Sequence, residues 1–180
     1  RFNENDLARP LSPYGISKLN FENYLNYFSS QKISKSEITI LRPSNIYGPW
    51  QNPNGEAGVV SIFANKMLKN ENVSIFGTGK EYRDYIYVDD VIDFIFQVLN
   101  LGVTGTYNLS SGISTKTIEI FNNISKILDY KKSPSFDVKR EGDIFGIELD
   151  NSKSKSIDWD SKIDLSTGLS QTINFLKNHE

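Results

Sequence analysis

The strongest constraint on the fold of this chain is a regular alternation of short β-branched segments with longer stretches of helical periodicity. Short runs rich in Val, Ile and Thr are typical of buried strands, whereas apolar residues spaced three and four apart are typical of helices. Alternating strands and helices predict an α/β chain. The expected helices are residues 13–30, 58–70, a stretch that Asp89 caps, 117–128 and 169–176, and the expected strands are 37–42, 73–76, 82–88 and 105–109.

Two glycine- and proline-containing segments between these elements are predicted to be turns. Residues 45–49 follow the strand 37–42 and carry turn-forming Asn, Gly and Pro. Gly77 and Gly79 lead into a strand-like segment and have no third glycine at the dinucleotide-fingerprint spacing, which predicts a hairpin turn. Neither Gly-x-Gly-x-x-Gly nor Gly-x-x-Gly-x-x-Gly occurs in the 180 residues.

Composition excludes several classes of function. The 20 basic and 22 acidic residues leave a net charge of −2, which argues against nucleic acid as a partner. No apolar run approaches the ~18 residues that span a bilayer, so we expect a cytoplasmic protein without a membrane partner. The chain has no cysteine and one histidine, His179. Disulfides, thiol chemistry and the common zinc sites are therefore not expected, and we assign no metal.

Tyr14 and Lys18 lie four residues apart in the first expected helix and therefore share a face. A free phenol is a poor base at neutral pH, and a neighbouring cation favours its phenolate form. The pair is a candidate general acid/base site. The alternative is a solvated helix face with a partly packed tyrosine.

Asn45 stands just beyond the strand 37–42, where open α/β sheets place ligand contacts. Its amide can both donate and accept hydrogen bonds, which suits a polyhydroxylated ligand. The alternative is an ordinary strand-to-loop turn.

Arginine is scarce, with 5 arginines against 15 lysines. Arg83 and Arg140 are candidate phosphate ligands, because a planar guanidinium binds phosphate through two parallel hydrogen bonds. The alternative for Arg83 is an ion pair with Asp84 or another neighbour. Arg42 is expected to be a structural ion-pair partner.

Taken in order, these segments resemble the C-terminal half of an extended short-chain dehydrogenase/reductase of the NAD-dependent sugar-nucleotide epimerase/dehydratase family. The resemblance runs over residues 10–178. It rests on Pro13-Tyr-Gly-Ile-Ser-Lys18 with Glu22, Leu41-Arg-Pro-Ser-Asn-Ile-Tyr-Gly-Pro49, the run from Ile75 to Asp90, Asn108-Leu-Ser-Ser-Gly112, Arg140-Glu-Gly-Asp143, and Asp158-Trp159 with Gly168-Leu169.

The resemblance implies NAD as cofactor and a nucleotide-sugar as substrate, UDP-linked in the 4-epimerase pattern. Tyr14 would be the acid/base, Lys18 would hold the nicotinamide ribose, and Pro43 would contact the nicotinamide. The implied substrate contacts are Asn45 for the sugar or its phosphate, Phe76 for the base, Arg83 and Arg140 for the diphosphate, and Val59 and Val60 for the nucleotide pocket. Ile147 falls near a position that gates sugar size.

The same resemblance implies a partial Rossmann-type fold that lacks its N-terminal dinucleotide-binding half, joined to a small α/β substrate-binding domain. The expected division is a remnant of the NAD-binding domain in residues 1–57 and a mainly substrate-binding domain in 58–180, with segments around 82–115 returning to the Rossmann part. Without the glycine fingerprint, we expect this chain alone to bind NAD poorly and not to turn over substrate. Apolar surface on residues 10–49 would be covered by rearrangement or by a second copy, and the expected assembly is a homodimer.

Three functions follow from this resemblance. The leading one is part of a UDP-hexose 4-epimerase, acting on galactose and glucose or their N-acetyl forms. A sugar-nucleotide dehydratase or a keto-sugar reductase is the alternative within the family. A non-catalytic sugar-nucleotide-binding or oligomerisation domain is the alternative from another class.

Overall fold

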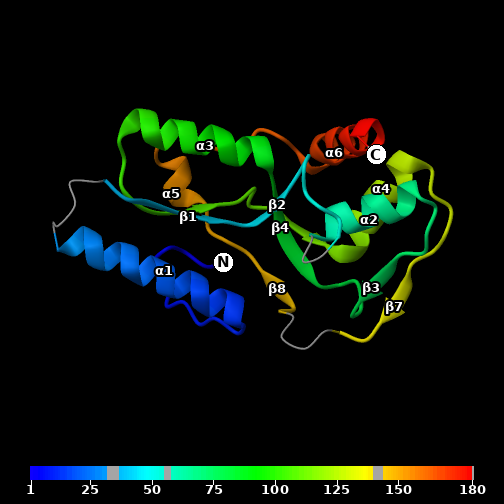
Figure 1. The fold of residues 1–180 in the computed structure, drawn as a ribbon, viewed down its shortest axis with the longest axis horizontal. Coiled ribbons are helices and arrows are strands. Elements are labelled where there is room, and N and C mark those ends of the chain that lie inside the picture. Colours follow the sequence, from blue (N-terminus) through cyan, green and yellow to red (C-terminus); the bar gives the residue numbers. More distant parts are fainter. Residues whose placement is uncertain (32–36, 55–57, 140–143, 180) are drawn as a thin grey trace.

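The computed structural model describes residues 1–31, 37–54, 58–139 and 144–179. Along the longest axis, one part of the molecule holds β1 and β5 between α1 and α3, and the other holds α2, α4 and α6 beside β3 and β7 (Figure 1). The elements in chain order are α1 (Pro13–Ser30), β1 (Thr39–Pro43), β2 (Asn45–Tyr47), α2 (Val59–Leu68), β3 (Ser74–Phe76), β4 (Tyr82–Tyr87), α3 (Val88–Leu101), β5 (Gly105–Leu109), β6 (Ser114–Lys116), α4 (Thr117–Leu128), β7 (Ser135–Asp137), β8 (Gly146–Ile147), α5 (Ser152–Lys155) and α6 (Leu165–His179).

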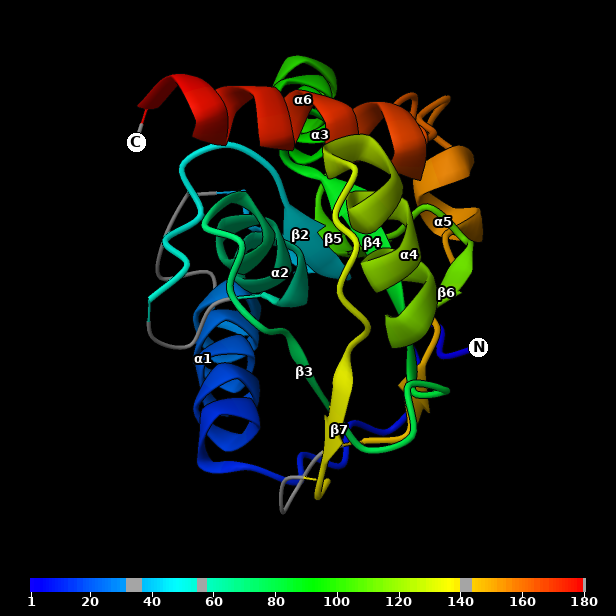
Figure 2. The ribbon, with the colours of Figure 1, turned by 90° about the vertical axis from the view of Figure 1, so that its right-hand side faces the viewer.

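Parallel pairing dominates the strands, as the alternation of strands and helices suggests. β1 pairs in parallel with β5, with Thr39 opposite Gly105. β4 joins the two parts of the molecule, because it pairs in parallel with β2 and β8 and antiparallel with β6. β3 pairs in parallel with β7 (Figure 2). Because β1 and β5 pair in parallel, their carboxyl ends lie together. The residues that follow these ends, Ser44 and Ser111, both donate hydrogen bonds to Asp84 of β4.

Helix α1 follows the predicted bounds, because its start is specified locally. The Ser12 hydroxyl accepts a hydrogen bond from the Gly15 amide at 3.1 Å, and Pro13 occupies the first helical position. Helix α4 also has the predicted bounds, and its apolar stripe of Ile120, Phe121 and Ile124 is buried.

Three local predictions are wrong. Residues 45–47 of the predicted turn form β2, because Tyr47 is buried and β2 pairs with β4. The Gly77–Gly79 turn does not close a hairpin, because β3 pairs with the distant β7. Asp89 does not cap α3, which has Tyr87 as its N-cap and carries Asp89 in its first turn.

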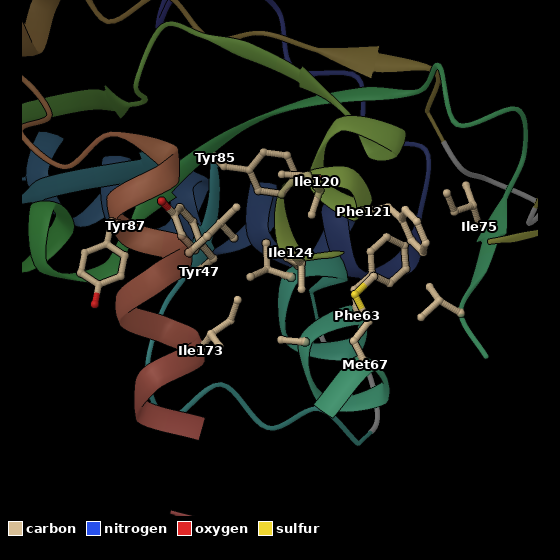
Figure 3. Close-up of a cluster of buried hydrophobic side chains, with 14 residues drawn as sticks. Tyr47, Phe63, Met67, Ile75, Tyr85, Tyr87, Ile120, Phe121, Ile124 and Ile173 are labelled. Atoms are coloured by element: carbon tan, nitrogen blue, oxygen red, sulfur yellow. The ribbon is translucent and has the colours of Figure 1, made fainter. Parts of the chain in front are cut away.

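Two hydrophobic clusters hold the two parts of the molecule. In the larger cluster, Tyr47 and Tyr85 from β2 and β4 meet Ile120 and Ile124 from α4 and Ile173 from α6 (Figure 3). The smaller cluster lies under α3, where the rings of Phe94 and Trp159 pack edge to face with centroids 5.0 Å apart. None of the described helices has the length and apolar character that a membrane crossing requires.

Buried tyrosines in the larger cluster are expected to make the stability of the folded chain fall at alkaline pH. Tyr85 is 7% exposed, and burial raises its pKa from 10.0 to about 12. The folded state holds the Tyr85 proton more tightly than the unfolded state does. The resulting contribution to the free energy of unfolding is therefore complete below pH 10 and is lost as the pH rises towards 12. Two pKa units correspond to about 3 kcal/mol.

We expect urea unfolding at pH 8 and at pH 11.5 to show a smaller loss of stability in Tyr85→Phe than in the unsubstituted chain. Burial also raises the pKa of Tyr47 and Tyr87, so the variant retains part of the loss. Equal losses in the two proteins would contradict the assignment of this pH dependence to Tyr85.

Candidate functional site

Three of the predicted site residues line one cavity at the carboxyl end of β1. The cavity has a volume of about 420 Å³, and Tyr14, Pro43 and Asn45 contribute to its wall. The remaining lining residues are Arg42, Ser44, Asp84, Ile147 and Leu149. Residues from α1, from the β1–β2 connection, from β4 and from β8 therefore converge where open α/β sheets bind ligands.

Lys18 lies beside Tyr14, as their spacing on a helix predicts. Its Nζ is 5.2 Å from the centroid of the Tyr14 ring, within the range of a cation–π contact. The Tyr14 side chain is 67% exposed and so is accessible to a ligand. Lys18 also lines an adjoining cavity of about 830 Å³, which Ser12, Gly15 and Arg42 line as well.

NAD is the cofactor that the resemblance implies, and the residues around this second cavity fit one end of it. The ammonium of Lys18, the hydroxyl of Ser12 and the guanidinium of Arg42 supply hydrogen-bond donors for the hydroxyl groups of a ribose. Lys18 and Tyr14 would hold the ribose beside the nicotinamide, and Pro43 would meet the nicotinamide itself.

Arg42 is an ion-pair partner, as predicted, and its partner is Glu22 of α1. The Arg42 Nε lies 2.9 Å and 3.2 Å from the two carboxylate oxygens of Glu22, and its Nη2 donates to Oε2 at 2.5 Å. The Arg42 Nη1 donates to the backbone carbonyl of Glu4 at 3.2 Å. The hydrogen bond to Glu22 raises the pKa of Arg42 further.

Asp84 lines the cavity and was not among the predicted site residues; it was named only in the alternative for Arg83, as one of its ion-pair partners. It is 2% exposed, and its carboxylate accepts hydrogen bonds from the Ser44 hydroxyl at 3.1 Å, from the Ser111 amide and hydroxyl at 2.9 Å each, and from the Gly112 amide at 2.8 Å. Burial raises its pKa, and the four hydrogen bonds oppose that rise. Asp84 thus ties the turn before Asn45 to the loop after β5.

Arg83 does not pair with Asp84. Its Nη1 donates to the carbonyls of Tyr82 and Phe145, and its Nη2 donates to the carbonyl of Ile144 at 2.8 Å. The Nε–H and one Nη2–H of Arg83 make no hydrogen bond to a described residue. Arg140, the other predicted phosphate ligand, lies outside the described residues.

The three residues predicted to contact the nucleotide lie apart from the Tyr14 cavity. Phe76 is 39% exposed at the end of β3. Val59 is half-buried at the start of α2, whereas Val60 is 1% exposed and packs in the larger cluster. The Val60 side chain therefore supports the core, and any ligand contact from this position would come from its backbone.

Parallel strands between helices, with a cavity lined by polar and apolar side chains at the carboxyl end of β1, define an α/β protein of the Rossmann class. The model of the NAD dependent epimerase/dehydratase family matches residues 2–110, which is more than half of the chain. The chain therefore belongs to the NAD-dependent epimerase/dehydratase family.

Individual relatives agree with this membership. A Methanocaldococcus jannaschii protein provisionally described as a UDP-glucose 4-epimerase is 40% identical over 98% of this chain and 57% of its own length. The UDP-glucose 4-epimerase of Mycolicibacterium smegmatis is 34% identical over 95% of this chain and 55% of its own length. The crystal structure of the Thermotoga maritima UDP-glucose 4-epimerase with UDP-glucose matches with a TM-score of 0.93 at 37% identity, over 99% of this chain and 57% of that one. The chain thus spans a little over half the length of the relatives it matches.

The comparisons correct two predictions that the resemblance suggested. The assignment to a C-terminal half is wrong, because the match to the NAD-dependent family lies in residues 2–110, the N-terminal portion of this chain. The prediction of a partial Rossmann-type fold lacking its dinucleotide-binding half is wrong on the same finding. In physical terms, the described residues between 13 and 109 form α/β layers, with β1 and β5 paired in parallel between α1 and α3. The absence of a glycine fingerprint was too narrow a criterion for the fold, because the fingerprint describes one loop and not the α/β layers.

Proposed function

We propose that this chain carries the acid/base and sugar-binding residues of an NAD-dependent UDP-hexose 4-epimerase. The observation that carries the proposal is the meeting of Tyr14, Pro43 and Asn45 in one cavity, with Lys18 one helical turn beyond Tyr14. The similarity to UDP-glucose 4-epimerases at 34–40% identity supports it. Because the chain spans only part of those relatives, we propose that it binds sugar nucleotide alone but needs the complete protein for turnover.

Each residue has a defined task in this proposal. Tyr14 removes the proton of the sugar C4 hydroxyl and later returns a proton to the oxygen. Lys18 stabilises the phenolate form of Tyr14 through its charge and holds the nicotinamide ribose. Asn45 orients the sugar or its phosphate. NAD, held through its ribose by Lys18 and Tyr14, would supply the hydride acceptor and donor that C4 inversion requires.

The nucleotide half of the substrate is assigned to residues outside the Tyr14 cavity. We propose that Arg83 and Arg140 bind the diphosphate, that Phe76 contacts the base, and that Val59 and Val60 border the nucleotide pocket. The two N–H groups of Arg83 without a bond to a described residue are its available donors.

Titration calorimetry of the chain with UDP-glucose tests the assignment of Arg83. We expect binding by the unsubstituted chain and a loss of about 10- to 100-fold in affinity for Arg83→Ala, because a hydrogen bond to a charged group contributes about 1.5–3 kcal/mol. Arg83→Lys keeps the charge without the planar fork and should recover part of the affinity.

Lys177→Ala, which removes an exposed cation from the last turn of α6, is the matched control and should bind normally. Circular dichroism of each variant confirms that it is folded. A folded chain that binds no UDP-glucose would contradict the proposal and favour a purely structural or oligomerisation domain.

The alternative within the family has support of its own. An Escherichia coli dTDP-4-dehydro-6-deoxyglucose reductase is 30% identical over 98% of this chain, and a Dictyostelium discoideum dTDP-D-glucose 4,6-dehydratase is 26% identical over the same share. We rank these activities below 4-epimerisation, because the epimerases have the higher identities. The chemical products of turnover distinguish the epimerase, dehydratase and reductase activities.

A further inference from the structure

Helix α1 carries Tyr14 and Lys18, the proposed acid/base pair. It lies along one side of β1, away from the larger cluster (Figure 1), and none of its residues is buried. Its half-buried positions are Gly15, Leu19, Glu22 and Leu25, a single stripe at helical spacing.

One polar contact ties this stripe to the strands. Within the described residues, Glu22 is the one α1 residue whose side chain is bonded to a strand, and its partner Arg42 belongs to β1. The pair is fork-like, since Nε and Nη2 of the guanidinium both reach the carboxylate. The side chains are 28% and 17% exposed for Arg42 and Glu22, so that water screens the pair only in part.

The position of this ion pair connects it to the proposed chemistry. Tyr14, Lys18 and Glu22 follow one another at four-residue steps, so that fixing Glu22 fixes the direction of the other two. Arg42 directly precedes Pro43, and both line the cavity that Tyr14 enters. The ion pair therefore joins the helix with the acid/base residues to the strand end with the sugar-binding residues.

We propose that Glu22 is a positioning residue, whose fork-like pair with Arg42 sets the rotation of α1 and so aims Tyr14 and Lys18 at the bound sugar and ribose. This inference rests on the proposed function of Tyr14. A group misplaced by about 1 Å costs on the order of 100-fold in rate, so a rotation of α1 affects catalysis far more than it affects nucleotide binding.

The test is a pair of variants in the complete protein that carries these residues, assayed with NAD and UDP-galactose. Glu22→Gln removes the charge with nearly the same shape, and we expect kcat to fall about 10- to 100-fold while UDP affinity stays within about two-fold. Glu22→Asp keeps the charge but shortens the side chain by one methylene, and should give an intermediate kcat. This second variant keeps the test decisive if Glu22→Gln fails to fold.

Exchanging the two charges, Glu22→Arg with Arg42→Glu, should recover part of the kcat lost in either single variant, as expected of directly coupled residues. Glu71→Gln, at an exposed carboxylate between α2 and β3, is the matched control and should leave kcat unchanged. A purely stabilising pair would lower the melting temperature of Glu22→Gln and leave kcat of the folded enzyme intact, which would overturn the inference.

The proposed function fails in a different way. If it is wrong, the unsubstituted protein does not epimerise UDP-galactose, or Tyr14→Phe epimerises it normally. If only the positioning role is wrong, the unsubstituted protein epimerises UDP-galactose, Tyr14→Phe loses activity, and folded Glu22→Asp or Glu22→Gln retains the kcat of the unsubstituted protein.

Discussion

Replacing Tyr14 by phenylalanine is expected to lower kcat for the interconversion of UDP-galactose and UDP-glucose by about 10²–10⁴-fold, the usual contribution of a positioned general acid or base. The substitution removes one oxygen and retains the ring that Lys18 approaches at 5.2 Å. Because Tyr14 is 67% exposed and supports no core, the melting temperature should stay the same. Steady-state assays of the complete protein with NAD measure the effect, and calorimetry with UDP checks that nucleotide affinity is retained.

Tyr24→Phe provides the matched control for this result. Tyr24 lies on the same helix and is 66% exposed, but it lines neither cavity at the site. It should leave kcat unchanged. A Tyr14→Phe enzyme with more than about a tenth of the original kcat would remove Tyr14 from the acid/base role, since the loss would fall below the usual range for such a group.

The second large effect is structural. We expect Asp84→Ala to destabilise the chain by about 3 kcal/mol, because it removes a buried carboxylate and leaves the half-buried amides of Ser111 and Gly112 without their acceptor. For a chain of this length, that loss corresponds to a fall in melting temperature of roughly 6–12 °C. Thermal unfolding followed by circular dichroism measures it. Asp84→Asn keeps one acceptor oxygen and should lose less.

Asp137→Ala is the comparison for Asp84, since its side chain is exposed on β7. It should change stability by less than about 0.5 kcal/mol. A loss below about 1 kcal/mol for Asp84→Ala would show that the loop after β5 does not depend on this carboxylate, and that the turn before Asn45 is held by other contacts.

Local signals were sufficient for much of the fold. Ser12 and Pro13 define the start of α1, and the apolar periodicity of residues 117–128 defines α4. The prediction of an ion pair for Arg42 is confirmed as well. The residues that specify α1 and α4 lie within or next to each helix, so the local sequence is sufficient to predict them. The ion pair of Arg42 is predictable because a half-buried guanidinium needs a charged or polar partner.

The wrong predictions for residues 45–47 and for the Gly77–Gly79 turn, like the hydrogen bonds of Asp84, involve partners that are distant in the chain. Asp84 accepts hydrogen bonds from residues 27 and 28 positions later, and β3 pairs with β7 about 61 residues away. No periodicity in the sequence reports such pairings. The available signal for Asp84 was Ser44 after β1 together with Ser110 and Ser111 after β5, since serine hydroxyls and backbone amides need partners when they are removed from water.

The central claim is that these residues serve the inversion of a sugar carbon in a UDP-sugar. The most direct measurement is nuclear magnetic resonance of UDP-galactose incubated in D₂O with NAD and the complete protein that carries this chain. We expect UDP-glucose with ordinary hydrogen retained at C4, because the hydrogen that leaves C4 returns to the same carbon and only the hydroxyl proton exchanges with solvent. Formation of a 4-keto-6-deoxy sugar, or unchanged UDP-galactose in the presence of folded protein and NAD, would contradict it.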